Sequence, residues 1–201
     1  MKFTYHEIFN TLQGEGRNTG RPCIFIRFSG CNLKCPWCDT DFSPKATASL
    51  DELLEKLSTF QEKSVIFTGG EPLLQPHLLT LAKALKSSGY WLGIETNGTI
   101  EPSTELRETL DFIATSPKFG VPLRLTSANE VRLVTADEIT LEWCQTIRSQ
   151  LPAEDYYLSP CDTGHGLQVH RAIQLLGMLN VNSPTPPWRL SLQTHKLAGI
   201  P

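Results

Sequence analysis

Three closely spaced cysteines are the part of the sequence best suited to chemistry. Cys31, Cys35 and Cys38 form a Cys-x3-Cys-x2-Cys loop, and cysteine thiolates are metal ligands. A structural zinc ion takes four protein ligands, so a zinc knuckle here needs a distant histidine, because no second closely spaced Cys or His pair follows. A four-iron cluster held by three cysteines instead leaves one iron open. The spacing favours such a cluster, with an open site for a small molecule, and keeps zinc as the alternative.

Length and composition limit the classes of protein to consider. The chain has 201 residues, of which 40% are hydrophobic, so we expect residues 1–201 to form a single domain around one core. The net charge of −3 argues against nucleic-acid binding through overall charge.

The sequence also predicts a location. Residues 1–7 lack the apolar segment of a secretion signal, and no stretch approaches the ~20 apolar residues of a membrane span. Six cysteines without such a signal indicate a reducing compartment. We therefore expect a cytoplasmic protein with no membrane partner, in which Cys23 and Cys144 are buried in the core.

Strand-like and helix-like segments alternate along the chain. Apolar, β-branched and aromatic runs predict seven strands, at residues 22–28, 64–68, 91–95, 111–114, 130–134, 155–158 and 188–192. Apolar periodicity and capping boxes predict helices, at residues 50–60, 76–88, after 103, 135–150 and 168–179.

This order predicts an α/β fold with a mostly parallel sheet and right-handed crossovers. Six or seven strands are too few for a closed eight-stranded barrel, so we expect an incomplete (β/α) barrel. Polar and glycine-rich segments follow the strands, at the carboxyl edge where such folds bind ligands.

Two types of segment at this edge are candidates for ligand binding. In the Gly-Gly-Glu-Pro segment at residues 69–72, exposed carbonyls and Glu71 could accept hydrogen bonds from an ammonium group. Two further segments each start with Ser-Pro and offer hydroxyl, backbone and charged groups; they comprise Ser116, Pro117 and Lys118, and Ser159, Pro160, Cys161 and Asp162. Seen alone, each of these segments is explained more simply as an ordinary turn.

Single charged residues add to this set. Arg27 interrupts an apolar strand, so it either extends outward or pairs with an anion such as a carboxylate. Glu95, before a Thr-Asn-Gly turn, is either a ligand-binding residue or a carboxylate satisfied within the turn.

Taken together, these motifs resemble those of the radical S-adenosylmethionine (SAM) superfamily and, within it, of the 7-carboxy-7-deazaguanine synthases. The cysteine spacing, with Trp37 before the third cysteine, and the Gly-Gly-Glu-Pro turn carry the superfamily resemblance. The narrower resemblance rests on Gln-Gly-Glu-Gly at 13–16, Cys-Asp-Thr at 38–40, Glu-Thr-Asn-Gly at 95–98, Ser-Pro-Lys at 116–118 and Ser-Leu-Gln-Thr-His-Lys at 191–196.

The resemblance implies a fold of radical SAM type and a carbon–nitrogen lyase. The implied substrate is 6-carboxy-5,6,7,8-tetrahydropterin, which is converted to 7-carboxy-7-deazaguanine with loss of ammonia, in 7-deazapurine and queuosine biosynthesis. It implies a [4Fe–4S] cluster, SAM, Mg²⁺, an external one-electron reductant such as flavodoxin or ferredoxin, and a homodimer.

The resemblance also implies residue roles. Cys31, Cys35 and Cys38 would ligate the cluster, and Thr40 would ligate Mg²⁺. SAM contacts would come from Gly70, Ser116, Pro117, Lys118, Ser159, Pro160, Cys161 and Asp162. Substrate contacts would come from Leu12, Gln13, Gly14, Arg27, Thr68 and Pro201, with Glu15, Glu95 and His195 as second-tier candidates. Glu71 is a further second-tier candidate, as an acceptor for an ammonium group.

Two other classes of protein stay open. A glycyl-radical enzyme activase has a similar cysteine loop and glycine turn, but it must admit a large protein. A non-enzymatic metal-binding domain would explain the cysteines and leave the motifs after the other strands without a role.

Overall fold

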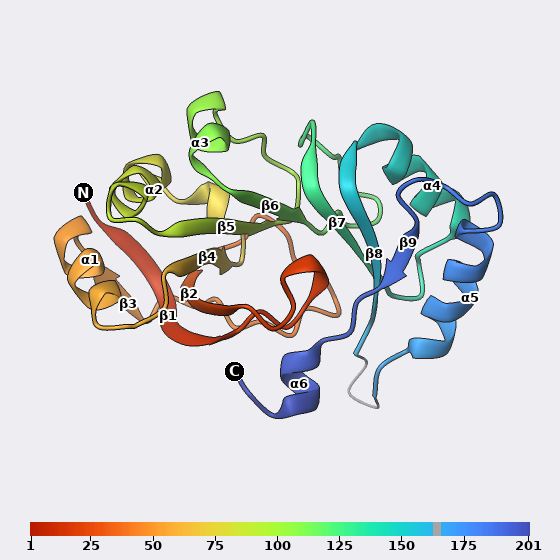
Figure 1. Ribbon diagram of the computed structural model, residues 1–201, viewed down its shortest axis with the longest axis horizontal. Helices are drawn as coiled ribbons and strands as arrows, with labels where there is room; N and C mark the ends of the chain where they lie inside the picture. The colour runs from red at the N-terminus through yellow and green to blue at the C-terminus, as the bar shows by residue number, and fades with distance from the viewer. Residues whose placement is uncertain (163–165) are drawn as a thin grey trace.

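The computed structural model describes residues 1–162 and 166–201 (Figure 1). The described strands form one nine-stranded sheet in the order β3-β1-β2-β4-β5-β6-β7-β8-β9. The strands are β1 (Phe3–Leu12), β2 (Pro22–Phe28), β3 (Ala46–Ala48), β4 (Ser64–Gly69), β5 (Trp91–Thr96), β6 (Phe112–Thr115), β7 (Ala128–Thr135), β8 (Ala153–Pro160) and β9 (Trp188–Leu190).

Seven of these strands, from β2 to β9 without β3, pair in parallel. They correspond to the seven predicted from the sequence. The two ends of the strand order do not pair with each other, so the sheet is open. The expected incomplete, mostly parallel α/β architecture is confirmed.

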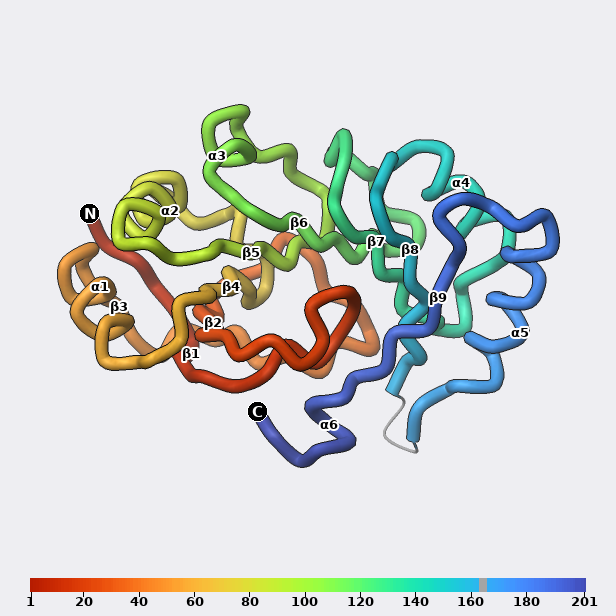
Figure 2. Tube along the Cα trace, in the orientation of Figure 1, coloured from red at the N-terminus to blue at the C-terminus, as the bar shows by residue number. Residues whose placement is uncertain are grey.

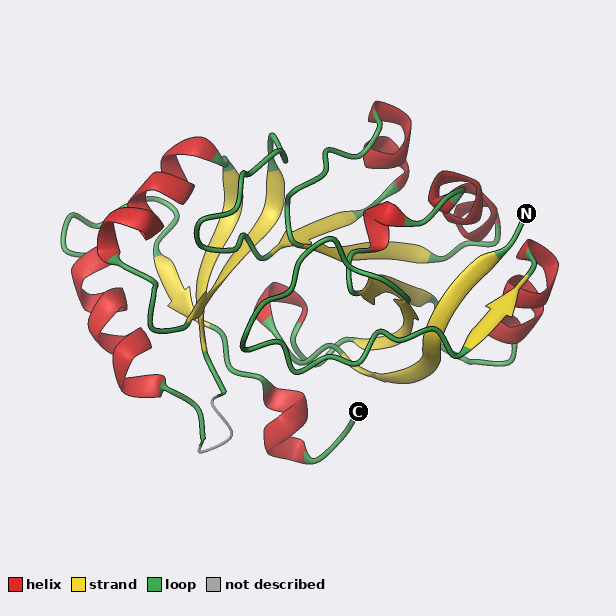
Figure 3. Ribbon diagram, turned by 180° about the vertical axis from the view of Figure 1, so that it is seen from behind, coloured by secondary structure: helices red, strands yellow, loops and turns green. Residues whose placement is uncertain are grey.

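The helices are α1 (Leu50–Ser58), α2 (Leu78–Ser87), α3 (Thr104–Thr109), α4 (Leu141–Gln150), α5 (Val169–Leu179) and α6 (Thr194–Ala198), with short 3-10 turns η1 (Gly16–Asn18) and η2 (Pro72–Leu74). Helices α1 to α5 lie in the connections between strands of the sheet, and α6 follows the last strand. Helices α1 to α5 lie around the outside of the curved sheet, whereas α6 lies apart from them (Figure 3). No helix within the described residues has the length and apolar character needed to cross a bilayer.

Of the two predicted capping boxes, the one at α1 is present and the one at residues 135–138 is not. Ser49 and Glu52 form the expected reciprocal cap of α1. The helix predicted to begin at residue 135 begins instead at Leu141. Thr135 is the last residue of β7, and Thr140 caps α4 by accepting a hydrogen bond from the Trp143 amide. The prediction was wrong because β7 extends to Thr135, the expected cap, and Thr140 is the residue that caps the helix.

Two N-terminal strands were not predicted. β1 pairs antiparallel with both β2 and β3 at one edge of the sheet. Its register shifts between Tyr5 and Glu7, and this irregularity breaks the alternation of apolar and polar residues that identifies a half-buried strand. β3 has only three residues, too few to give a pattern.

The C-terminal segment also differs from its prediction. The last strand was expected to continue to residue 192, but β9 ends at Leu190 and α6 follows. A five-residue helix makes little more than one turn, so it produces no detectable periodicity. In Figure 2, this segment runs beside the loop that follows β1, where the Thr194 amide donates to the Gly14 carbonyl at 3.0 Å.

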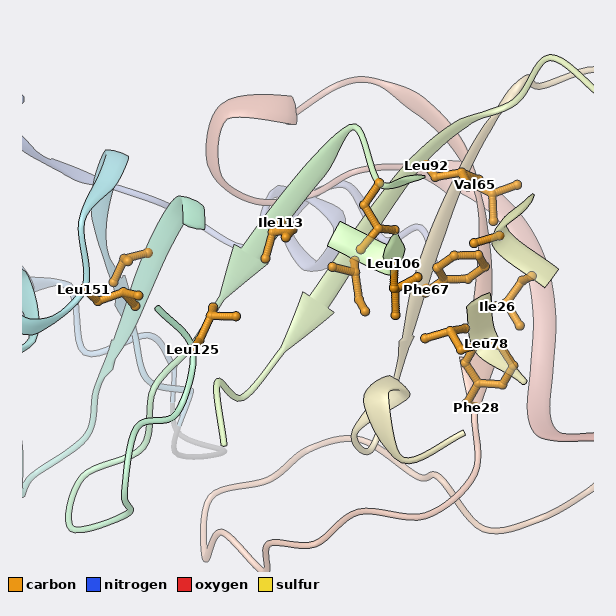
Figure 4. Close-up of a cluster of buried hydrophobic side chains, with 14 of the residues drawn as sticks. Ile26, Phe28, Val65, Phe67, Leu78, Leu92, Leu106, Ile113, Leu125 and Leu151 are labelled. Atoms are coloured by element: carbon orange, nitrogen blue, oxygen red, sulfur yellow. The ribbon is translucent and has the colours of Figure 1, made fainter. Parts of the chain in front are cut away.

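The core lies between the sheet and the helices around it. Figure 4 shows apolar side chains from β2, β4 and β5, including Ile26, Phe28, Phe67 and Leu92, packed with Leu78 and Leu106. Cys23 and Cys144 are buried, as predicted, and burial raises their thiol pKa values to about 11 and about 12. This core holds β4 and β5, whose carboxyl ends carry the glycine turn and Glu95.

We predict that Phe67→Ala lowers the free energy of unfolding by about 3–5 kcal/mol, because it removes a fully buried aromatic ring beside Phe28. Urea denaturation of the full chain measures the change. Phe119→Ala removes an equivalent ring that is 43% exposed and should cost much less. Equal losses for the two variants would contradict this account of the core.

Candidate active site

Two adjoining cavities lie at the carboxyl ends of the parallel strands. The larger has a volume of about 420 Å³, and the smaller has a volume of about 240 Å³. The residues that line both are Glu15, Asp39, Thr40, Thr68, Glu95 and Gln193. The two cavities therefore form one continuous site with two compartments.

The smaller cavity brings together the cysteine loop and the polar segments after β4, β6 and β8. Its lining includes Cys31, Cys35, Cys38, Gly70, Ser116, Lys118, Ser159, Pro160, Cys161 and Asp162. Pro117, also predicted to contact SAM, is buried and does not line this cavity. The sequence thus located all but one member of this set at a common cavity, although their individual contacts with SAM stay predictions.

The three cysteines offer the donor type that an iron–sulfur cluster takes. Within the described part of the chain, no three His, Cys, Asp or Glu side chains are close enough together to hold one metal ion. Each thiolate of a four-iron cluster binds a different iron, so the three sulfurs need not surround one point. Soft thiolate donors also suit iron–sulfur clusters. The donor set therefore fits a [4Fe–4S] cluster ligated by Cys31, Cys35 and Cys38.

The titratable groups of the smaller cavity include the cysteine thiols and the Lys118 amino group, and Cys35 and Lys118 influence each other's pKa. Burial raises the pKa of the Cys35 thiol, and Lys118 acts in the opposite direction. Burial lowers the pKa of the Lys118 ammonium, whereas the three thiols and Glu15 favour its charged form. The Lys118 Nζ donates to Ser116 Oγ at 2.8 Å and lies 4.9 Å from the centre of the Trp37 ring. Lys118 therefore places its amino group beside the cysteine loop.

The glycine turn after β4 is pressed against the start of the cysteine loop. A Cβ atom at Gly70 would overlap the Gly30 carbonyl and the Cys31 side chain. Gly69 has a φ of 135°, a conformation that favours glycine, and a Cβ there would overlap the Phe28 backbone. The Glu71 amide donates to the Gly30 carbonyl at 3.0 Å. Only glycines allow the two backbones to approach this closely.

Glu71 does not point into either cavity. It is fully buried, and its carboxylate accepts hydrogen bonds from the Leu73 amide, the Thr96 hydroxyl and the Asn97 amide. Burial raises its pKa, and these hydrogen bonds act against the shift. The sequence suggested Glu71 as an acceptor for an ammonium group, but the structure uses both of its oxygens within the protein.

The larger cavity contains every residue predicted for substrate contact. Its lining includes Leu12, Gln13, Gly14, Arg27, Thr68 and Pro201, together with Glu15, Glu95 and His195 from the second tier. Arg27 was expected either to extend outward or to pair with an anion, and the structure shows it paired with a carboxylate. Its Nε donates to Glu7 Oε1 at 2.7 Å, and its guanidinium lies 5.5 Å from the centre of the Phe9 ring.

Glu95 is held from two sides at the junction of the cavities. Gln13 Nε2 donates to its Oε1 at 2.8 Å, and Arg132 pairs with its Oε2. Arg132 is a buried residue of β7 that also lines the larger cavity, and the sequence analysis missed it. A charged residue within an apolar strand is the same signal that identified Arg27.

Helix α6 covers part of the larger cavity. A Cβ atom at Gly14 would overlap the His195 ring, and the Thr194 hydroxyl donates to the Gly14 carbonyl at 2.8 Å. Burial lowers the pKa of His195. Gly14 and Thr194 thus dock the C-terminal segment on the loop after β1.

Thr40 lies where the two cavities meet, directly after the cysteine loop. Its hydroxyl donates to Asp39 Oδ1 at 3.3 Å. Lys196 of α6 pairs with Asp39 at 2.5 Å and with Asp162 at 3.3 Å. These contacts join the C-terminal helix to the cysteine loop and to the end of β8.

A buried carboxylate lies behind the larger cavity. Glu130 of β7 accepts a hydrogen bond from the Arg17 amide at 2.6 Å and lies 3.3 Å from Arg132 Nε. Burial raises its pKa to about 7. The folded protein therefore binds a proton at Glu130 more tightly than the unfolded chain, whose carboxyl has a value near 4.5.

We predict that Glu130 makes the free energy of unfolding fall as pH rises from about 4.5 to about 7, because a raised carboxyl pKa stabilises the fold fully only below the unfolded value. Glu130→Gln should flatten this part of the pH profile, as measured by urea denaturation at several pH values. Glu142→Gln, which changes an exposed carboxyl on α4, is the control. An unchanged slope in Glu130→Gln would contradict the assigned burial effect.

Comparisons with known proteins agree with this geometry. A family profile described as the Radical SAM superfamily matches residues 25–148. A Haemophilus influenzae protein named 7-carboxy-7-deazaguanine synthase is 45% identical, over 98% of this chain and 94% of the relative. A Neisseria meningitidis protein of the same name is 42% identical, over 96% and 92%.

Solved structures give the same result for the fold. The crystal structure of QueE from Escherichia coli superposes with a TM-score of 0.73 and 27% identity, covering 96% of this chain and 94% of that chain. A structure of TYW1 with a lysine–pyruvate adduct has a TM-score of 0.52 and 15% identity, and it supports the fold alone. The chain therefore belongs to the radical SAM superfamily and, within it, to the 7-carboxy-7-deazaguanine synthase family.

Proposed function

We propose that this protein converts 6-carboxy-5,6,7,8-tetrahydropterin to 7-carboxy-7-deazaguanine with loss of ammonia. The observation that supports this most directly is the shared wall of the two cavities. Thr40, Thr68 and Glu95 face both the compartment with the cysteine loop and the compartment with the residues matched to pterin contacts. Bound SAM and bound substrate would therefore be in contact.

We assign the smaller cavity to the cofactors. The [4Fe–4S] cluster and SAM, when bound, supply one-electron cleavage of SAM to a 5′-deoxyadenosyl radical. Gly70 lets the turn after β4 lie directly against the cysteine loop, and it lines the same cavity as the three cysteines. Ser116, Pro117 and Lys118 and the segment at 159–162 would hold the rest of SAM, with Pro117 acting through its backbone.

We assign the larger cavity to the pterin. Arg27 presents a planar fork suited to the substrate carboxylate, and Glu7 and Phe9 orient it. Gln13 and Arg132 fix Glu95 as an acceptor for ring N–H groups. Further contacts would come from Leu12, Gly14, Glu15, Thr68, His195 and Pro201.

The two other classes explain less of the site. A glycyl-radical enzyme activase must admit a protein segment, whereas α6 docks on Gly14 across the larger cavity. A non-enzymatic metal-binding domain has no use for a second compartment lined by Arg27 and Glu95. The relatives compared above carry neither of these names.

Other features of the proposal follow from the family resemblance. We propose a single domain, a homodimer, a cytoplasmic location and a flavodoxin or ferredoxin as the one-electron donor. We also propose that Thr40 ligates Mg²⁺, because a hydroxyl oxygen suits a hard cation and Thr40 lies between the two compartments.

The direct test is anaerobic incubation of the cluster-loaded protein with SAM, dithionite and 6-carboxy-5,6,7,8-tetrahydropterin. We expect 7-carboxy-7-deazaguanine and ammonia in equal amounts, detected by liquid chromatography with mass spectrometry and by an ammonia assay. Arg27→Met should raise the KM for the pterin at least tenfold, on the basis of one lost charge-assisted pair. SAM cleavage without any deazaguanine product would exclude the proposed reaction.

We predict that Thr40→Ala keeps the cluster and SAM cleavage but weakens the stimulation of turnover by Mg²⁺, because the variant lacks the hydroxyl ligand. A magnesium titration of the product-formation rate measures this, with Thr47→Ala in β3 as a control. A wild-type magnesium response in Thr40→Ala would remove Thr40 from the metal site.

A further inference from the structure

Three motifs of the site are joined by a polar network that runs from the buried Glu71 to the surface. Glu71, in the turn after β4, accepts a hydrogen bond from the Asn97 amide at 2.8 Å and from the Thr96 hydroxyl at 2.8 Å. Glu71 is fully buried, and Asn97 is 7% exposed. Because a buried carboxylate is costly unless it is hydrogen-bonded, Glu71 fixes the backbone of the turn after β5.

The side chain of Asn97 continues this network to the cysteine loop. Its Nδ2 donates to Asn32 Oδ1 at 3.0 Å, and its Oδ1 accepts from the Thr99 hydroxyl at 2.6 Å and from the Thr99 amide at 2.9 Å. Asn32 Nδ2 in turn donates to the Thr99 hydroxyl at 2.8 Å. Asn32, Asn97 and Thr99 thus form a closed ring of side-chain hydrogen bonds.

We propose that Asn97 and Asn32 are positioning residues that fix the start of the cysteine loop on the ends of β4 and β5. Asn32 directly follows Cys31, so the ring holds the first of the three thiolates in place. The assignment of a cluster to this loop rests on the proposed function. The ring itself rests only on hydrogen bonds between side chains of this chain.

The chemistry of the amide explains why asparagine is needed at both positions. Each side chain must donate through one atom and accept through another, which an amide does and a carboxylate does not. The loop has few other anchors near Cys31. These include hydrogen bonds from the Gly30 amide to Phe42 and from the Glu71 amide to Gly30. Loss of the ring should therefore loosen residues 30–38 without unfolding the core.

Amide hydrogen exchange of the full chain before cluster loading tests the positioning role without using activity. We expect Asn97→Ala to speed exchange in residues 30–38 about five- to tenfold, the change that follows from losing roughly one net hydrogen bond. Asn180→Ala is the matched control. Asn180 also donates and accepts one hydrogen bond each, at 2.9 Å, but with Trp188 at β9, and it should leave residues 30–38 at the wild-type rate.

The double variant separates a connected ring from two independent contacts. If Asn32 and Asn97 act through each other, Asn32→Ala/Asn97→Ala should exchange no faster in residues 30–38 than Asn97→Ala alone. Multiplied effects of the two substitutions would contradict the ring. If Asn97→Ala does not fold, Asn32→Ala carries the same test, because Asn32 lies on the surface.

Cluster retention is the second measurement. After anaerobic loading, we expect both single variants to lose iron to a chelator several-fold faster than the wild type and Asn180→Ala, and Asn97→Asp to resemble Asn97→Ala because it lacks the donor. Wild-type rates of exchange and iron loss in both single variants would overturn the proposal. Failure of the wild type itself to take up iron would contradict the proposed function and leave the exchange result to decide the ring.

Discussion

The parallel pairing of β2 with β4 is the constraint on which the site depends. Their register sets Phe28 opposite Gly69, so the cysteine loop and the glycine turn leave neighbouring strands at the same level. Their backbones then touch at Gly30 and Gly70. Because a side chain at position 70 would collide with the loop, the sequence of the turn is dictated by the loop beside it. The other motifs at the carboxyl edge of the sheet are placed relative to this contact.

The remaining strands extend the same principle. Parallel strands end at one edge, and here that edge collects Glu95 from β5, Lys118 after β6 and Asp162 after β8. The loop after β1 and helix α6 then close the larger compartment from the side. The two compartments share a wall because the strand order, rather than the chain order alone, determines which loops are neighbours.

Much of this arrangement could be predicted from the sequence. Apolar runs identified all seven parallel strands, and the cysteine spacing identified a loop that lines the smaller cavity. The antiparallel β1 could not be found because its register shift breaks the alternation, and α4 starts later than predicted because β7 runs through Thr135. Glu71 shows the limit most clearly: its motif indicated ligand contact, but only tertiary contacts reveal that Thr96 and Asn97 occupy its oxygens. Arg132 is the opposite case: no motif marked it as a site residue, and its place in the site is visible only through its pairing with Glu95 on a different strand.

The central claim is that Cys31, Cys35 and Cys38 hold a four-iron cluster with one iron open to SAM. Electron paramagnetic resonance of the reduced, anaerobically loaded protein tests it most directly, with SAM labelled with nitrogen-15 at its amino group. The account predicts a changed spectrum on SAM addition and a hyperfine coupling from the label to the cluster. A spectrum that SAM leaves unaltered, or bound zinc in place of iron, would contradict it.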